Sequence, residues 1–248
     1  MNNSINKDTE YYYAGEFGFF NVILLPILEK YNGKKLSIHT FPDYCYIIKN
    51  LFDDKFDCFE IKLAKLRLLN NCVENEDYKI KYKSIETLLK CGEIWQMNNF
   101  DKISKIISTN FIPDQDISEF VCYFPRFRDS GAISTNFKLR NSTNSECEYI
   151  LNLLNPKYKT IILGKETLQF DYTKYNTYKI EDIEKSIYYL KNCKFLISND
   201  SGYIDFAKNC GCKNIIIIRP IEDYHFKFNP FNSSLYNIDK ISQLESLI

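Results

Sequence analysis

The chain has 248 residues, enough to bury one large core or two small ones. Its hydrophobic content of 45% and aromatic content of 16% exclude a disordered chain, which lacks the apolar surface needed to fold. Lys and Arg number 32 together, as do Asp and Glu. The balance creates no net field that would attract nucleic acid or an anionic membrane, so nucleic acid is not expected among the partners.

The nine cysteines follow neither a metal-ligand nor a disulfide pattern. There is no Cys-x-x-Cys pair, and the chain has only two histidines, so we expect no metal site and free thiols in a reducing compartment. The first ten residues are polar, and no apolar run has the length of a membrane span. We therefore expect a cytoplasmic protein without a transmembrane segment.

Apolar periodicity in the first half predicts strands that alternate with helices. The expected strands and helices lie, in chain order, at 11–14 (strand), 19–31 (helix), 36–41 (strand), 42–52 (helix) and 56–61 (strand). Pro26 falls inside the first helix, where it must kink the helix or mark a first turn. The β-α-β-α-β order indicates a parallel sheet with helices on its faces.

The middle of the chain has a weaker pattern, from which we expect helices near 84–96 and 100–108. Residues 108–119 have the polar composition and the proline of a linker. The sequence therefore predicts two domains, 1–112 and 113–248.

The alternating pattern restarts after this linker. We expect Ser145 to open a helix that has Glu146 and Glu148 in its first turn. The expected strands lie at 120–125, 158–164, 194–198 and 214–220, and the expected helices at 145–154, 180–192, 203–210 and 238–248. The predicted fold class is α/β, with two facing Rossmann-like domains, parallel sheets and an inter-domain cleft.

Ligands of parallel sheets bind beyond the carboxyl ends of the strands, where one turn has a suitable composition. The turn comprises Ser198, Asn199, Asp200, Ser201 and Gly202. It joins an apolar strand to a helix, whose N-terminus exposes unpaired N–H groups and a partial positive charge, and glycine permits close approach of a diphosphate. The alternative is that Asp200 or Ser201 is only an N-cap and Gly202 only a tight turn.

The surrounding stretch, CKFLISNDSGYIDFAKNCGCKNIIII (193–218), resembles the hallmark of the ADP-heptose:LPS heptosyltransferase-like glycosyltransferases. In that family a strand ends in Asp-[Ser/Thr]-Gly, a short helix of small residues follows, and a glycine leads to the next strand. Ala207 and Gly211 match those later positions. The family usually continues with Pro-Met-His, where this chain has Tyr203-Ile204-Asp205. The resemblance implies a GT-B architecture of two facing Rossmann-like domains.

The N-terminal half carries a second, weaker similarity to this family. Gly15-Glu16, followed by Pro26, is similar to the family's Gly-Asp turn and proline-containing helix, with Glu in place of Asp. The resemblance implies that Glu16 is the general base that deprotonates the acceptor hydroxyl for an inverting attack. Gly15, beside it, is assigned to donor binding. The alternative is a carboxylate that only favours the helix N-terminus.

Two arginines, Arg126 and Arg128, follow the first strand of the second domain. We expect them to bind the donor diphosphate and offset the charge of the leaving group, which requires no metal. The alternative is a surface salt bridge. Lys138 and Arg140 in the same loop are lesser candidates.

The next strand ends in Gly164, Lys165 and Glu166. Related sugar transferases hold the nucleotide base and ribose near this turn, so these residues are assigned to donor binding, although Glu166 can equally be a solvated loop charge. His39 lies near the end of an expected strand, and Asp223 and His225 follow the last one; these three residues receive no role.

The resemblance therefore predicts a glycosyltransferase that moves a sugar from a nucleotide-diphosphate donor to an acceptor hydroxyl, without a cofactor or metal. The acceptor would be a glycan, a lipid-linked sugar or a protein, bound by the first domain. Two alternatives remain: a nucleotide-sugar epimerase of the same shape, which the scarcity of histidine opposes, and a non-catalytic nucleotide- or sugar-binding protein. A glucosyltransferase acting on modified DNA bases shares the fold, but the zero net charge opposes it.

Overall fold

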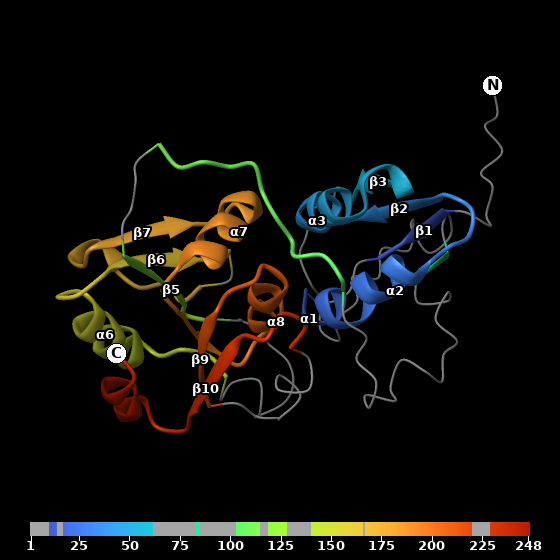
Figure 1. Ribbon diagram of the computed structural model, residues 1–248. Coiled ribbons are helices and arrows are strands. Elements are labelled where there is room, and N and C mark those ends of the chain that lie inside the picture. Colours follow the sequence, from blue (N-terminus) through green and yellow to red (C-terminus); the bar gives the residue numbers. More distant parts are fainter. Residues whose placement is uncertain are drawn as a thin grey trace. The chain divides into compact units, whose positions relative to one another are not determined.

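The computed structural model describes residues 10–13, 17–61, 83–84, 103–114, 119–127, 140–165, 167–219 and 229–248. The chain divides into two compact units, Met1–Lys105 and Ile106–Ile248, and each unit holds one sheet (Figure 1). All strand pairs in both sheets are parallel. The predicted α/β class with two Rossmann-like parallel sheets is confirmed.

The first sheet has the strand order β3-β2-β1-β4. Its strands are Glu10–Tyr12 (β1), Leu36–Thr40 (β2), Phe56–Glu60 (β3) and Lys83–Ser84 (β4). Helix α3 (Pro42–Phe52) starts at a proline, as predicted, because Pro is preorganised for the first helical turn and needs no hydrogen-bond acceptor there. A single-turn 3-10 helix, η2 (Asp53–Lys55), connects it to β3.

The segment between β1 and β2 is helical but changes register in its middle. It consists of α1 (Phe17–Phe19), a π-helical turn η1 (Phe20–Leu24) and α2 (Leu25–Lys30). Pro26 lies in the first turn of α2, which confirms one of the two roles expected for it. Proline cannot donate to the carbonyl four residues before it and crowds that carbonyl, and the wider π turn relieves the conflict.

An aromatic cluster packs this helical segment against α3 and the end of β1. The rings of Phe20 and Tyr44 stack with centroids 4.2 Å apart, and Tyr13 contacts both. Much of the aromatic content of the first unit therefore serves core packing, as aromatic side chains commonly do.

The prediction of a helix at 100–108 is wrong for residues 103–108, which the structure describes, because residues 103–114 contain no helix. Their backbone N–H groups bond to distant partners instead. The N–H of Ser104 donates to both carboxylate oxygens of Glu29, at 2.8 and 2.9 Å, and the N–H of Ile107 donates to the carbonyl of Asn209 at 2.9 Å. The helix expected at 84–96 lies outside the described residues except for Ser84, which belongs to β4.

The second sheet has the strand order β10-β9-β8-β5-β6-β7. Its strands are Phe120–Phe124 (β5), Lys159–Leu163 (β6), Thr177–Ile180 (β7), Leu196–Asn199 (β8), Asn214–Ile218 (β9) and Ser234–Ile238 (β10). The edge strands β7 and β10 were not predicted, because their exposed positions interrupt the apolar run that is typical of a buried strand.

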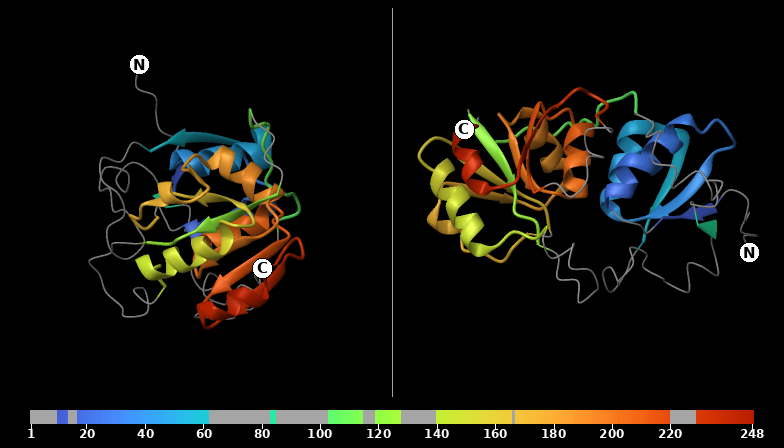
Figure 2. Two further views of the ribbon diagram at one scale, coloured as in Figure 1. Left: turned by 90° about the vertical axis from the view of Figure 1, so that its left-hand side faces the viewer. Right: turned by 90° about the horizontal axis from the view of Figure 1, so that it is seen from below.

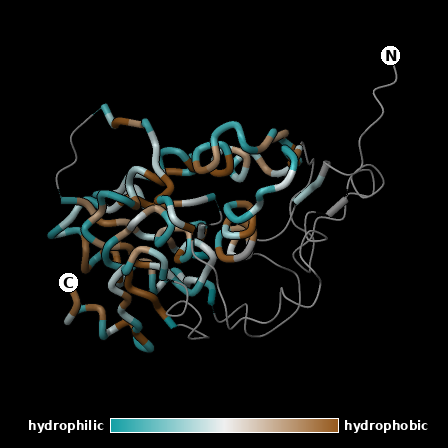
Figure 3. Tube along the Cα trace, turned by 45° about the vertical axis from the view of Figure 1, so that its right-hand side comes forward, coloured by the Kyte–Doolittle hydropathy of each residue, from teal (hydrophilic) through white to brown (hydrophobic). Residues whose placement is uncertain are grey.

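Helices cover both faces of this sheet (Figure 2). They are α6 (Asn144–Leu154) and the 3-10 helix η5 (Ile241–Ser246) on one face, and α7 (Ile183–Asn192) and α8 (Gly202–Asn209) on the other. Another 3-10 helix, η4 (Tyr172–Lys174), precedes β7. Figure 3 shows hydrophobic stretches inside this unit and hydrophilic ones toward its outer loops. Among the described residues, no helix combines the length and the apolar character needed to cross a bilayer.

Three helix predictions in the second unit need correction. The helix expected at 180–192 begins at Ile183, because Ile180 pairs in β7. Helix α6 is opened by Thr143 rather than Ser145: the Thr143 side chain accepts from the N–H of Glu146 at 3.2 Å, and the Glu146 carboxylate accepts from the N–H of Thr143 at 2.9 Å. This reciprocal pair is a capping box. The terminal helix expected at 238–248 is the shorter 3-10 helix η5, because its first residue, Ile238, pairs in β10.

Candidate functional site

The strand order places several expected site residues at one edge of the second sheet. Strands β5, β8 and β9 are neighbours and parallel, so the segments that follow them lie at the same edge. Arg126 follows β5, Asp200 follows β8 and Arg219 follows β9. This carboxyl edge is where ligands of open α/β sheets bind.

An ion pair joins Arg140 to the turn after β8. The Nη1 atom of Arg140 lies 3.3 Å from Oδ1 of Asp200. The Asp200 side chain is fully buried and that of Arg140 is 20% exposed. A buried carboxylate of this kind is stabilised by its cation partner, so Asp200 holds Arg140 at the carboxyl edge.

The rest of the turn is linked to the same loop and to itself. The hydroxyl of Ser142 donates to Oδ1 of Asn199 at 2.8 Å, and the hydroxyls of Ser198 and Ser201 lie 3.3 Å apart. Ser201 occupies the N-cap position of α8, but its side chain makes no capping hydrogen bond. The side chain of Ser201 therefore does not cap α8.

Arg126 is buried, at 7% exposure, and is bonded to the loop before α6. Its Nη1 donates to the side-chain oxygen of Asn141 at 2.7 Å, and its carbonyl accepts from the N–H of Ser142 at 2.7 Å. Its backbone also forms a bridge with Thr167, beyond the end of β6. Arg126 is thus bonded to the short loop before α6 that also contains Arg140.

Asn141, Ser142 and Arg219 join this site without having been expected there. The Nη2 atom of Arg219 lies 3.4 Å from the carbonyl oxygen of Asn141 and 2.7 Å from Oε1 of Glu146. The sequence signal for Arg219 was its position, a cation directly after an apolar strand. Asn141 and Ser142 have no such signal, because their contacts are with residues distant in sequence.

Three buried polar atoms at this edge have no hydrogen-bond partner among the residues that the structure describes. They are Nδ2 of Asn199, Oγ1 of Thr167 and Nε of Arg219. Buried donors are normally paired, and an unpaired one has a substantial free-energy cost. Two of the three are obligate donors, and all three are covered from solvent.

The positions where the chain departs from the Pro-Met-His pattern have their own contacts. Tyr203 stacks on Phe124 with ring centroids 4.3 Å apart. Asp205 forms a buried ion pair with Lys208, Oδ1 to Nζ at 3.0 Å. Burial lowers the pKa of Lys208, and the charge of Asp205 opposes that change. Asp205 thus stands where the Pro-Met-His pattern has histidine, and its carboxylate is paired with Lys208.

Comparison with known proteins adds one similarity. No protein-family model matches the sequence, and no curated protein matches it. Among solved structures, the chain is similar to a glycosyl transferase of family 9 from Veillonella parvula DSM 2008. The TM-score is 0.51 at 10% identity, over 96% of this chain and 87% of that chain. The chain therefore shares its fold with that protein.

In the second unit, Gly164 leaves room for the Phe124–Tyr203 stack. Its φ of 93° lies in the left-handed region, and a Cβ added there would come 2.5 Å from the Phe124 ring. Glycine is required on both grounds. Lys165, the next expected donor-binding residue, is exposed.

The remaining expected site residues lie outside the described part of the chain or away from this edge. Those outside it are Gly15, Glu16, Arg128, Lys138, Glu166, Asp223 and His225. His39, in the first unit, packs against Phe59 with ring centroids 5.0 Å apart.

Proposed function

We propose that the protein transfers a sugar from a nucleotide-diphosphate donor to an acceptor hydroxyl, with inversion at the anomeric carbon and without a metal. The observation that carries the proposal is the gathering of Arg126, Arg140 and Arg219 at the carboxyl edge of the second sheet, on a chain with a glycosyltransferase fold. Arg140 and Arg219 are paired with Asp200 and Glu146, whereas Arg126 is bonded to the neutral side chain of Asn141. The guanidinium of Arg126 suits a donor whose leaving group is a nucleoside diphosphate.

The second unit would bind the donor. When the bond between the anomeric carbon and the diphosphate oxygen breaks, negative charge develops on that oxygen, and guanidinium groups held in place beforehand stabilise it. Arg126 and Arg128 are assigned this role. The turn of residues 198–202 would support it through the N-terminus of α8, and the turn of Gly164, Lys165 and Glu166 would receive the nucleoside.

The first unit would bind the acceptor, which is a glycan, a lipid-linked sugar or a protein. Glu16 would accept the proton of the acceptor hydroxyl as the oxygen attacks the anomeric carbon from the face opposite the leaving group, which inverts the configuration. In chain order Glu16 belongs to the segment between β1 and α1, and catalytic side chains of parallel sheets commonly come from segments that follow strands.

Thermal stabilisation by nucleoside diphosphates tests this proposal. UDP, GDP, ADP, CDP and TDP are added separately, with and without EDTA. We expect one of them to raise the melting temperature regardless of EDTA, since bound ligand stabilises the folded state. Arg126→Ala should abolish the shift.

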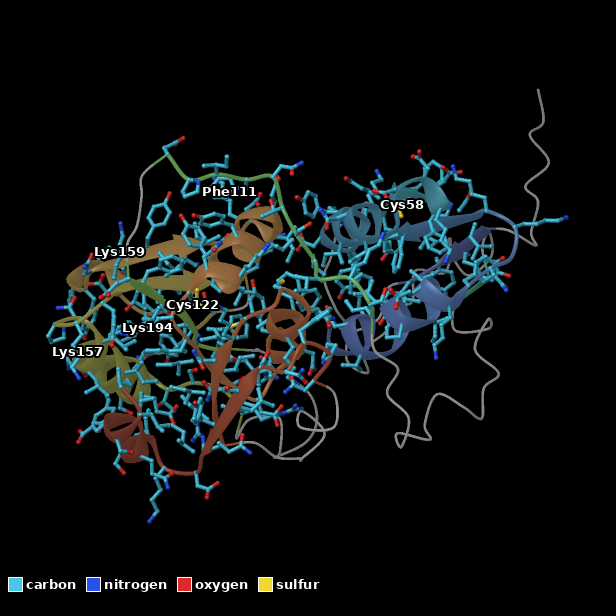
Figure 4. The ribbon with its side chains drawn as sticks, viewed as in Figure 1. Cys58, Phe111, Cys122, Lys157, Lys159 and Lys194 are labelled. Carbon is cyan, nitrogen blue, oxygen red and sulfur yellow. The ribbon has the colours of Figure 1, made fainter. Side chains whose placement is uncertain are left out.

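The matched control is Lys157→Ala, which removes a cation at the amino end of β6 (Figure 4). This variant should retain the shift. The proposal is wrong if no diphosphate stabilises the protein, and metal independence is wrong if EDTA removes the shift.

A further inference from the structure

Arg219 has a strained backbone at the carboxyl edge of the second sheet. It follows β9 directly, and its φ is 51°. A residue with a Cβ is disfavoured in this left-handed region by about 1 kcal/mol, whereas glycine is not. Strained positions gather at functional sites, where the surrounding structure holds them in place. The backbone strain at Arg219 therefore indicates a role for its side chain.

The guanidinium of Arg219 connects two parts of the loop that leads into α6. Its Nη2 lies 2.7 Å from Oε1 of Glu146, whose other carboxylate oxygen closes the capping box with Thr143. The same Nη2 donates to the carbonyl of Asn141 at 3.4 Å. The end of β9 is thereby tied to the start of α6.

Asn141 in turn connects Arg219 to Arg126. Its side-chain oxygen accepts from Nη1 of Arg126 at 2.7 Å, and its main-chain oxygen accepts from Arg219. The two arginines follow strands that lie on opposite sides of β8. One asparagine therefore lies between two guanidinium groups and bonds to both.

We infer that Arg219 is a positioning residue of the proposed donor site, which orients Arg126 by holding Asn141 between the two guanidinium groups. The inference rests on the proposed function, because it assigns Arg126 to the donor diphosphate. Without the Arg219 guanidinium, Asn141 loses one of the contacts that fix it, and the acceptor of Arg126 is held less firmly. A misplaced charge binds a diphosphate more weakly, because binding must then also order the side chain.

The variant Arg219→Gly tests this role, because it removes the guanidinium and relieves the backbone strain at the same time. Calorimetry with the nucleoside diphosphate that stabilises the wild type measures the dissociation constant. We expect Arg126→Ala to weaken binding at least about tenfold and Arg219→Gly about fivefold. The double variant should stay within about twofold of Arg126→Ala, since a residue that acts through Arg126 has no effect once Arg126 is gone.

Two further variants separate positioning from general stability. Asn232→Gly relieves the same kind of strain, at a φ of 56° in an exposed turn, and should leave affinity unchanged. Glu146→Gln removes the carboxylate that holds Arg219 and should weaken binding about as much as Arg219→Gly.

Three outcomes would overturn the inference. If Arg126→Ala weakens binding but Arg219→Gly does not, the proposed function stands and the positioning role fails. If the two losses multiply in the double variant, Arg219 acts independently of Arg126. If the wild type binds no nucleoside diphosphate, the proposed function fails and this role with it.

Discussion

Arg140 and Asp200, which are 60 positions apart in the sequence, form an ion pair of 3.3 Å at the carboxyl edge of the second sheet. The pair joins the loop before α6 to the turn between β8 and α8. Because Asp200 is fully buried, its structural role is to hold a cation rather than to present a carboxylate to solvent.

Asp200→Asn should destabilise the second unit. The substitution keeps the size of the side chain but leaves the Arg140 charge without its carboxylate, and breaking a buried pair in this way costs about 3 kcal/mol. Urea unfolding measures the change. Glu181→Gln is the control, because Glu181 pairs with Lys179 in an exposed position, where loss of the pair costs less than about 1 kcal/mol. Equal effects of the two substitutions would contradict the role of Asp200.

Gly164→Ala should be more harmful than an ordinary substitution of glycine by alanine. Its φ is 93°, and the new methyl group would lie 2.5 Å from the Phe124 ring, so we expect a loss of about 2 kcal/mol or more from strain and overpacking. Gly33→Ala is the control, because a methyl group there would meet only the end of the Tyr31 side chain. A melting temperature of Gly164→Ala equal to that of Gly33→Ala would show that the Phe124 contact does not restrict this position.

The second unit should lose stability in alkali. Burial raises the pKa of the Cys147 thiol from about 9 to about 11, so between these values the folded protein keeps a proton that the unfolded chain releases. The contribution is fully present below pH 9 and is lost as the pH rises through 11, by at most about 1.4 kcal/mol per pH unit. Other buried thiols, including Cys122 in the interior of the unit (Figure 4), have a raised pKa and act in the same direction.

Urea unfolding at pH 8 and pH 10.5 measures this loss. Cys147→Ala removes one titrating thiol, so its free energy of unfolding should fall less between the two pH values than that of the wild type, by about 2 kcal/mol. An equal fall in both proteins would exclude Cys147 as a source of the pH dependence.

The central strands were predictable because they are buried on both faces and form continuous apolar runs. This holds for β5, β6, β8 and β9, and helix α3 was predictable from Pro42 and its apolar spacing. The edge strands β7 and β10 were not predictable, since a strand that is exposed on one side has no continuous apolar run.

The candidate site was predictable only where its residues follow strands. Residues 198–202 and Arg126 were expected at the carboxyl edge because the chain order alone places them there. The contacts of Asn141 with Arg126 and Arg219, and of Ser142 with Asn199, depend on the folding of a loop against distant strand ends. No periodicity or spacing in the sequence encodes such contacts, so tertiary structure was needed to find them.

Glu16→Gln should separate catalysis from donor binding. If Glu16 removes the acceptor proton, the amide cannot replace it, and the turnover number should fall by about 100-fold or more. The affinity for the nucleoside diphosphate should stay within about twofold, because the side chains proposed to bind the diphosphate belong to the second unit. An unchanged rate would show that Glu16 is not the base, and for a protein without catalytic activity the substitution would have no effect at all.

The release of nucleoside diphosphate from nucleotide sugars tests the central claim most directly. Water can replace the acceptor slowly, so that the bond from the anomeric carbon to the diphosphate breaks and water supplies the new hydroxyl. Hexoses linked to UDP, GDP, ADP, CDP or TDP are incubated with the protein in EDTA. The account predicts release from one nucleotide class, with inverted configuration by NMR and a slower rate in Arg126→Ala. Binding of a nucleoside diphosphate without release from any donor would contradict it and indicate a nucleotide-binding protein instead.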